Sequence, residues 1–177
     1  MPDYPKKNEC LYCPYFCEEN IWHLSQHPKL RAHNRNVVFI SNLSRQCFFH
    51  NQKAGENGYV IWDYHVVLLA DHLIFDFDSL LRFPVPLQEY LNQSFGLEEE
   101  SNYSPLFKLV EADAFVREFS SDRNHMLNSQ GKYLQPPPVW EEICDKKVNN
   151  LDCFIDMQSR EYGAKILSLN ELYDEFR

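Results

Sequence analysis

The hydrophobic pattern of the chain predicts several short strands. Apolar runs rich in β-branched or aromatic residues and bounded by polar loops are typical of strands buried in a sheet. The longest run is residues 59–70 ("YVIWDYHVVLLA"), and residues 72–80 ("HLIFDFDSL") are expected to pair with it as a hairpin across a turn near Asp71. Two earlier runs, separated from the hairpin by a loop with two glycines, predict further strands: residues 36–42 and 46–52.

A helical pattern precedes these strands. Residues 17–27 ("CEENIWHLSQH") predict a helix, which the His27-Pro28 step ends because a residue before proline avoids the α region. Glu18 and Glu19 fall in its first turn, where the helix dipole favours negative charge. The side chains expected on its buried side are Ile21, Trp22 and Leu24.

The second half of the chain contains fewer clear patterns. Residues 107–119 change from a strand-like to a helical pattern, and residues 164–176 predict a strand followed by a helix. At that helix start, Ser168 and Glu171 match a capping box. Three consecutive prolines exclude regular structure from residues 130–140. Two segments are expected to be surface connections: 83–86 and 96–105.

Length and composition fit one globular domain. The chain has 177 residues, of which 44% are hydrophobic and 15% aromatic, enough to bury a sizeable core. We find no internal repeat and no linker. The predicted elements therefore indicate an α+β fold with a mainly antiparallel sheet packed against helices. Residues 1–9 are expected to be a polar tail, and residues 10–177 a single domain.

Charge and targeting patterns exclude several classes of partner. The formal net charge of −9 and the pI near 5.2 argue against nucleic acid or an anionic membrane as the main partner. No apolar run approaches the ~20 residues needed to cross a bilayer, and the N-terminus lacks the apolar segment of a secretory signal. We expect a monomer in the cytosol or nucleus, where the six cysteines stay reduced.

The predicted hairpin carries ionisable residues on otherwise apolar strands. Side chains alternate along a strand, so Asp63 and His65 share one face, as do Asp76 and Asp78 on the partner. A two- or four-residue turn puts His65 on the same face as both aspartates, whereas a three-residue turn without a bulge separates them. In the four-residue case His65 lies directly opposite Asp76, with Cβ atoms roughly 5 Å apart.

This arrangement suggests the base half of a nucleophilic triad. A histidine oriented by a carboxylate within a buried sheet can act as a general base toward a nucleophile. The alternatives are a structural core histidine at position 65 and solvated aspartates on an exposed strand face. Geometry alone leaves the choice between Asp76 and Asp78 open.

Cys17 lies at the predicted start of the first helix. The helix dipole and nearby backbone N–H groups favour its thiolate, which is the nucleophilic form. Glu18 and Glu19 oppose this, so the thiolate needs a neighbouring imidazolium. The alternative is a buried structural cysteine. Cys10 and Cys13 are expected to be structural cysteines of this kind or surface thiols.

A zinc site is a further alternative for the N-terminal cysteines. Cys10 and Cys13 form one Cys-x2-Cys pair, and His23 and His27 lie four residues apart on the helix. A structural zinc site needs four ligands, usually as two spaced pairs, and no second pair follows at the usual distance. A cysteine followed by a strand histidine and a carboxylate is instead the chain order of papain-like hydrolases and transglutaminases.

Five segments of the chain, in sequence order, are "CLYCPYFCEENIWHL", "YVIWDYHVVLL", "LIFDFDSLLRFP", "SDRNHM" and "YLQPPPVW". Together they closely resemble the protein N-terminal glutamine amidohydrolase family. The most specific motif is the Trp62-Asp-Tyr-His-Val66 pentapeptide, and the similarity runs from about Cys10 to the C-terminus. One departure is the connection at residues 25–36, which is compressed, so we expect the rim of the site to differ more than its chemistry.

The resemblance implies a papain/transglutaminase-like fold in which residues 10–177 form a single catalytic domain. It places the nucleophile on Cys17 at a helix N-terminus, the base on His65 and the acid on Asp76, the first aspartate of "FDFD". The implied reaction converts an N-terminal glutamine of a protein or peptide to glutamate with release of ammonia, and needs no metal or cofactor. It would feed degradation through arginylated N-terminal residues, the N-degron pathway.

Recognition of a chain terminus requires acceptors for the α-ammonium group. Glu18, Asp63 and Asp122 are the candidates, and each can instead be an ordinary surface or hairpin carboxylate. Two other functions remain open: a cysteine protease or transglutaminase on the same scaffold, and a zinc-stapled adaptor that binds N-terminal degrons without chemistry.

Overall fold

The computed structural model describes residues 3–96, 102–144 and 148–177. Most elements are short, and strands outnumber α-helices. The strands are β1 (Arg35–Ser41), β2 (Cys47–His50), β3 (Tyr59–Trp62), β4 (His65–Ala70), β5 (Leu73–Phe75), β6 (Val85–Pro86), β7 (Leu106–Glu111) and β8 (Lys165–Ser168). The α-helices are α1 (Cys17–Ser25), α2 (Leu87–Phe95), α3 (Ala112–Glu118), α4 (Leu151–Ile155) and α5 (Leu169–Glu175).

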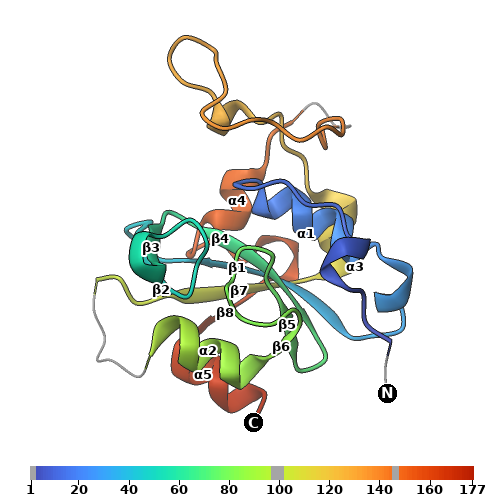
Figure 1. Cartoon of the computed structure of the whole chain (residues 1–177), viewed down its shortest axis with the longest axis vertical. Coiled ribbons are helices and arrows are strands. Elements are labelled where there is room, and N and C mark those ends of the chain that lie inside the picture. The colour runs from blue at the N-terminus through green and yellow to red at the C-terminus, as the bar shows by residue number, and fades with distance from the viewer. Residues whose placement is uncertain (1–2, 97–101, 145–147) are drawn as a thin grey trace.

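The centre of the fold is a six-stranded antiparallel sheet with the order β6-β5-β4-β1-β7-β8. A separate two-stranded sheet pairs β2 with β3. Helices α1, α3 and α4 cover one face of the large sheet, and α2 and α5 cover the other (Figure 1). The predicted α+β class with a mainly antiparallel sheet is confirmed.

Strand β4 is central because its side chains are apolar on both faces. Val66 and Leu68 belong to the core under α1, α3 and α4, whereas Val67 and Leu69 belong to the core over α2 and α5. All six residues of β4 are buried. Alternation along one strand thus builds two hydrophobic cores, and a strand with two apolar faces requires covering layers on both sides.

The predicted strand 59–70 is wrong in one respect, because it is two strands in two sheets. The break falls at Asp63 and Tyr64, where the Asp63 carboxylate accepts a hydrogen bond from the Tyr64 N–H (2.9 Å) and the Asp63 carbonyl accepts one from the Ser41 hydroxyl (2.6 Å). These bonds replace ladder bonds at the point where the chain leaves β2 as a partner and joins β1. His65 is therefore the first residue of a strand.

The predicted hairpin after β4 is confirmed, with a shorter second strand. Ala70 pairs with Leu73, so the turn has two residues, and Asp71 adopts a positive φ of 53° as such tight turns require. The four-residue turn that would put His65 opposite Asp76 is wrong. Because β5 ends at Phe75, Asp76 and Asp78 lie in the loop beyond the ladder.

Helix α2 is absent from the sequence-based prediction. Its buried residues Leu87, Tyr90, Leu91 and Ser94 follow the i, i+3, i+4, i+7 spacing of an amphipathic helix. The preceding segment 83–86, predicted as a surface connection, contains the edge strand β6. Of the predicted connection at 96–105, residues 97–101 lie outside the described residues.

Several local predictions are confirmed. Helix α1 begins at Cys17 and ends at Ser25, two residues before the predicted end, with Ile21 and Leu24 buried. The capping box at Ser168 is formed with both reciprocal bonds. The strand-to-helix changes occur as β7–α3 and β8–α5, and residues 130–140 contain no helix or strand.

Three further features bear on the sequence-based expectations. The six cysteines are all free thiols. In the described part of the chain no helix is long and apolar enough to cross a membrane. The Tyr4 ring contacts Phe75 with centroids 5.8 Å apart, and Lys7 Nζ donates to the Phe77 carbonyl. The division into a tail at 1–9 and a domain at 10–177 stays a prediction.

A buried ion pair attaches α1 to the segment that follows α3. Glu19 is fully buried, and its carboxylate accepts two hydrogen bonds from the Arg123 guanidinium, both 2.7 Å long. Trp140 Nε1 donates to the same carboxylate (2.6 Å), and Arg123 also donates to the carbonyl groups of Trp140 and Glu141. Glu19, predicted as a first-turn residue favoured by the helix dipole, is thus also an interior anchor.

We expect Arg123→Met to lower the free energy of unfolding by about 3–5 kcal/mol, because it leaves the buried Glu19 carboxylate without its partner. Arg82→Met removes an exposed pair with Glu89 and should cost less than about 1 kcal/mol. Urea unfolding followed by fluorescence measures both. Equal losses in the two variants would contradict the anchoring role.

Candidate active site

A cavity of about 600 Å³ lies where the start of α1 meets the break between β3 and β4. Cys17 and His65 both open onto it, from α1 and β4, two elements that pack against each other. Further lining residues used below are Tyr12, Trp62, Asp63, Tyr64, Asp78, His125 and Asp152. The cavity therefore combines a thiol, an imidazole and carboxylates.

Cys17 is the first residue of α1, and its side chain is only 9% exposed. Burial, together with the negative charges of Glu18 and Asp78, raises the pKa of the Cys17 thiol well above its ordinary value. A backbone hydrogen bond from Val66 acts in the opposite direction but does not reverse the shift. A position at the start of a helix is therefore not enough to ionise the Cys17 thiol. This agrees with the expectation that the adjacent glutamates oppose the thiolate.

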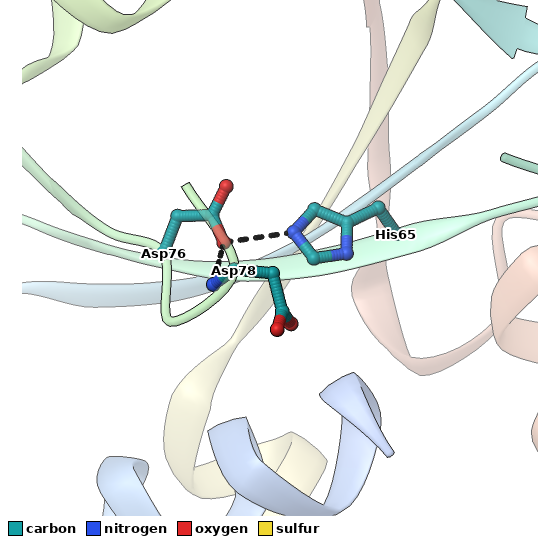
Figure 2. A group of neighbouring side chains, drawn as sticks. All are labelled: His65, Asp76 and Asp78. Carbon is teal, nitrogen blue, oxygen red and sulfur yellow. Dashed lines mark hydrogen bonds and ion pairs between the residues drawn. The ribbon is translucent and has the colours of Figure 1, made fainter. Parts of the chain in front are cut away.

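His65 is held in place by Asp76 and by aromatic rings. His65 Nε2 lies 2.9 Å from Asp76 Oδ1 (Figure 2), and both side chains are almost completely buried. The ring stacks on Trp62 and meets the edge of Phe49. Burial opposes the charged imidazolium, but the Asp76 carboxylate, with smaller contributions from Asp78 and Glu18, raises the pKa of His65.

Asp76 accepts hydrogen bonds from four groups. Besides His65, the Asp78 backbone N–H donates to Oδ1 (2.9 Å), while Gln52 Nε2 (3.1 Å) and the Tyr90 hydroxyl (2.9 Å) donate to Oδ2. Burial would raise the pKa of Asp76, but the His65 charge and these bonds hold it well below its ordinary value. Asp76 is therefore a carboxylate at neutral pH, and its charge stabilises the imidazolium that His65 becomes when it accepts a proton.

Asp78 occupies a different position from Asp76. Figure 2 shows its carboxylate turned away from the Asp76–His65 bond. Asp78 Oδ1 accepts a hydrogen bond from the Tyr12 hydroxyl (2.5 Å), and burial raises the pKa of Asp78. The structure thus pairs the His65 ring with Asp76, which the strand register left undecided.

Two lysines meet the backbone between these aspartates. Lys7 Nζ and Lys53 Nζ both donate to the Phe77 carbonyl. Burial and the neighbouring Lys53 charge lower the pKa of Lys7 to about 8. The two lysine side chains place positive charge beside the Asp76–Asp78 loop. This charge offsets the repulsion between the two neighbouring carboxylates.

The three carboxylates predicted to bind an ammonium group are in different surroundings. Glu18 is fully buried next to Cys17, with its Oε2 accepting from the Tyr64 hydroxyl (3.1 Å) and its Oε1 lying 3.4 Å from His125 Nε2. Asp63 lines the cavity. Asp122 does not: its carboxylate accepts hydrogen bonds from Asn124 and Asn149.

Sequence reasoning missed several residues that complete the site. Tyr64 and His125 contact Glu18, and both stand inside motifs quoted above, so the motifs were the available signal. Tyr12, which contacts Asp78, stands inside the first of those motifs. Gln52 and Tyr90 reach Asp76 from a predicted strand and from the missed helix α2, and no local pattern marks them.

The cysteines do not converge on a common metal position. Cys10 Sγ donates to the Lys6 carbonyl (3.3 Å), and Cys13 Sγ donates to the Pro136 carbonyl (3.6 Å). Within the described residues, the one group of three or more potential ligands is His65, Asp76 and Asp78, whose ligand atoms lie within 4.8 Å of one another. In this group His65 and Asp76 already bond each other, so the arrangement favours proton chemistry.

Comparison with known proteins gives a consistent result. The model of the N-terminal glutamine amidase family matches residues 12–176. Proteins named protein N-terminal glutamine amidohydrolase are 35% identical in Bos taurus and 33% in Homo sapiens, each over 190 residues, covering 99% of this chain and 91% and 92% of the relatives. The Drosophila melanogaster protein of that name is 34% identical over 189 residues, covering 98% of this chain and 91% of the relative. The chain therefore belongs to the N-terminal glutamine amidase family.

Proposed function

We propose that this protein hydrolyses the side-chain amide of an N-terminal glutamine, producing an N-terminal glutamate and ammonia. The observation that carries the proposal is the buried His65–Asp76 pair, which opens on the same cavity as Cys17. The names of the relatives supply the substrate. A cysteine at a helix start, followed along the chain by the histidine and the aspartate, also supports a papain/transglutaminase-like fold.

In the proposed mechanism Cys17 is the nucleophile. His65 takes the thiol proton, and the Cys17 sulfur attacks the carboxamide carbon of the substrate. The imidazolium then protonates the departing nitrogen, and a thioester and ammonia result. His65 next deprotonates the water that cleaves the thioester. The backbone N–H of Cys17, at the N-terminus of α1, can donate to the oxyanion in both steps.

The directions of the pKa shifts determine where the proton resides. The pKa of Cys17 is raised well above its ordinary value, so the resting thiol is protonated at neutral pH. The pKa of His65 is raised as well, so an imidazolium formed by proton transfer is stabilised by Asp76. Thiolate and imidazolium therefore form together as a pair when His65 accepts the proton.

Glu18 is the best-placed acceptor for the substrate α-ammonium. Its carboxylate is buried, contacts Cys17 Sγ at 3.6 Å and is oriented by Tyr64. Oε1 is buried and has no hydrogen bond from any described residue, although His125 is near enough for an ion pair. Asp63 on the cavity wall is a second acceptor. Asp122 is separated from the cavity and does not support this role.

Several properties extend the proposal beyond the site. The chemistry requires no metal or cofactor, because thiol, base and oxyanion donor all come from the chain. We place the reaction upstream of arginylation in the N-degron pathway, in the cytosol or nucleus. A protease or transglutaminase activity, and a zinc-bound adaptor, are the competing functions that the experiments below distinguish.

Cys17→Ser should lower turnover of an N-terminal glutamine peptide by at least about 10³-fold while leaving the fold intact, because a serine hydroxyl is far less acidic than a thiol. Cys13→Ser is the matched control and should keep most activity. Ammonia release and circular dichroism measure activity and fold. A folded Cys17→Ser protein with near-wild-type turnover would refute the assignment.

Asp76→Asn should lower turnover by about 10³–10⁴-fold, because a neutral amide cannot stabilise the charged imidazole or select its tautomer. The same change should lower the pKa of His65, since Asp76 contributes most to raising it, and NMR titration of the ring measures this. Asp78→Asn should lose far less activity. Equal losses in two folded variants would show that the acid is misassigned or shared.

The substrate should be a free N-terminal glutamine. We expect at least about tenfold slower ammonia release from an acetyl-Gln peptide, because the cap removes the charge that pairs with buried acceptors. Asparagine, one methylene shorter, should fail because its carbonyl carbon does not reach Cys17. Peptides of identical sequence beginning Gln, acetyl-Gln or Asn, or carrying an internal Gln, test this. Comparable release from the acetylated or internal-Gln peptide would favour the protease or transglutaminase function.

A further inference from the structure

Asp78 is a carboxylate of the cavity that the Cys17–His65–Asp76 chemistry does not use. Its side chain lines the cavity although the residue is only 9% exposed. Oδ1 accepts from the Tyr12 hydroxyl, and we find no hydrogen bond to Oδ2 from any residue that the structure describes. Oδ2 is therefore a carboxylate oxygen of the cavity wall that can accept a hydrogen bond from a bound ligand.

The position of Asp78 relates it to the proton that His65 transfers. His65 binds Asp76 through Nε2, so Nδ1 is the nitrogen left to exchange a proton with the thiol and the substrate. An oxygen of Asp78 lies within 4.8 Å of a ring nitrogen of His65. The charge of Asp78 also reaches Cys17, whose pKa it raises. Asp78 therefore borders both the nucleophile and the base.

A carboxylate beside the nucleophile disfavours the thiolate, so its presence needs a compensating interaction. Asp76 already orients His65, and Glu18 and Asp63 are available for the α-ammonium. The donor left without an acceptor is the carboxamide nitrogen of the substrate. Since His65 Nδ1 must protonate this nitrogen, the nitrogen has to lie next to Nδ1, in the cavity that Asp78 also lines.

We propose that Asp78, oriented by Tyr12, binds the carboxamide NH₂ of the substrate and the ammonia formed from it. This inference rests on the proposed amidohydrolase function. As the bond from Cys17 Sγ to the carboxamide carbon forms, the nitrogen loses its amide resonance and becomes basic. It takes the proton from His65 Nδ1, the carbon–nitrogen bond breaks, and ammonia leaves as the thioester forms. The nitrogen-bound hydrogens become more acidic during protonation, so their bond to Asp78 strengthens in the transition state.

The proposal makes Asp78 a determinant of amide selectivity. A γ-methyl ester of an N-terminal glutamate has the same carbon chain and gives the same thioester, but its leaving oxygen carries no hydrogen for Asp78. Hydrolysis of the thioester is common to both substrates. The ratio of kcat/KM for the amide to kcat/KM for the ester therefore isolates the contact to the leaving group.

The test compares two peptides that differ only in their first residue, glutamine or glutamate γ-methyl ester. Mass spectrometry follows the common N-terminal glutamate product. In Asp78→Asn we expect kcat/KM to fall about 10- to 100-fold for the amide and to stay within about threefold for the ester. Tyr12→Phe keeps the carboxylate but removes the bond that orients it, so the same ratio should fall by a smaller factor.

Asp152→Asn is the matched control, because Asp152 lines the same cavity with a side chain 85% exposed and should leave the ratio unchanged. An unchanged ratio in the folded Asp78 and Tyr12 variants would overturn the proposal. So would a selective loss of discrimination between free and acetylated termini in Asp78→Asn, which would assign Asp78 to the α-ammonium. Absence of glutamine turnover in the wild-type protein would instead refute the proposed function itself.

Discussion

The structure is organised around one buried negative charge, the Asp76 carboxylate. An isolated carboxylate in this position would be strongly destabilising, so the fold must supply donors from several directions. The donors are His65 at the start of β4, the Asp78 backbone N–H beyond β5, Gln52 just after β2 and Tyr90 in helix α2. Meeting this one requirement fixes the ring of His65 and connects the large sheet to helix α2 and to the segment after β2.

The break between β3 and β4 positions the site on this framework. If residues 59–70 formed one continuous strand, His65 would lie inside a ladder, with its ring facing packed neighbours. The change of sheet at Asp63 makes His65 a strand start, so its ring meets Trp62 and the cavity. Helix α1 is anchored through the Glu19–Arg123 pair and brings the Cys17 sulfur to the same cavity.

Negative charge is concentrated around Cys17. Burial raises the pKa of Cys17, and the charges of Glu18 and Asp78 raise it further. Such surroundings favour a neutral thiol in the absence of substrate. They also interact favourably with any positively charged or hydrogen-bond-donating group that enters the cavity. A terminal glutamine brings both kinds, an α-ammonium and a carboxamide NH₂. Binding of the proposed substrate would thus offset the charges that keep Cys17 protonated, and substrate selection and activation of the nucleophile would be coupled.

Local patterns determined the elements whose signals are contained in a few adjacent residues. They predicted α1, β1, the capping box at Ser168 and the β4–β5 hairpin. Apolar periodicity and helix caps depend on residues only a few positions apart, so the sequence shows them directly. The motif resemblance indicated the Cys17, His65 and Asp76 roles, which remain proposals. Tertiary structure decided the break at Asp63, the partner of the His65 ring and the burial of Glu18 and Glu19. These depend on contacts between residues 11 to 121 positions apart, such as His65–Asp76 and Glu19–Trp140, and no local pattern encodes which distant side chain will satisfy a buried charge.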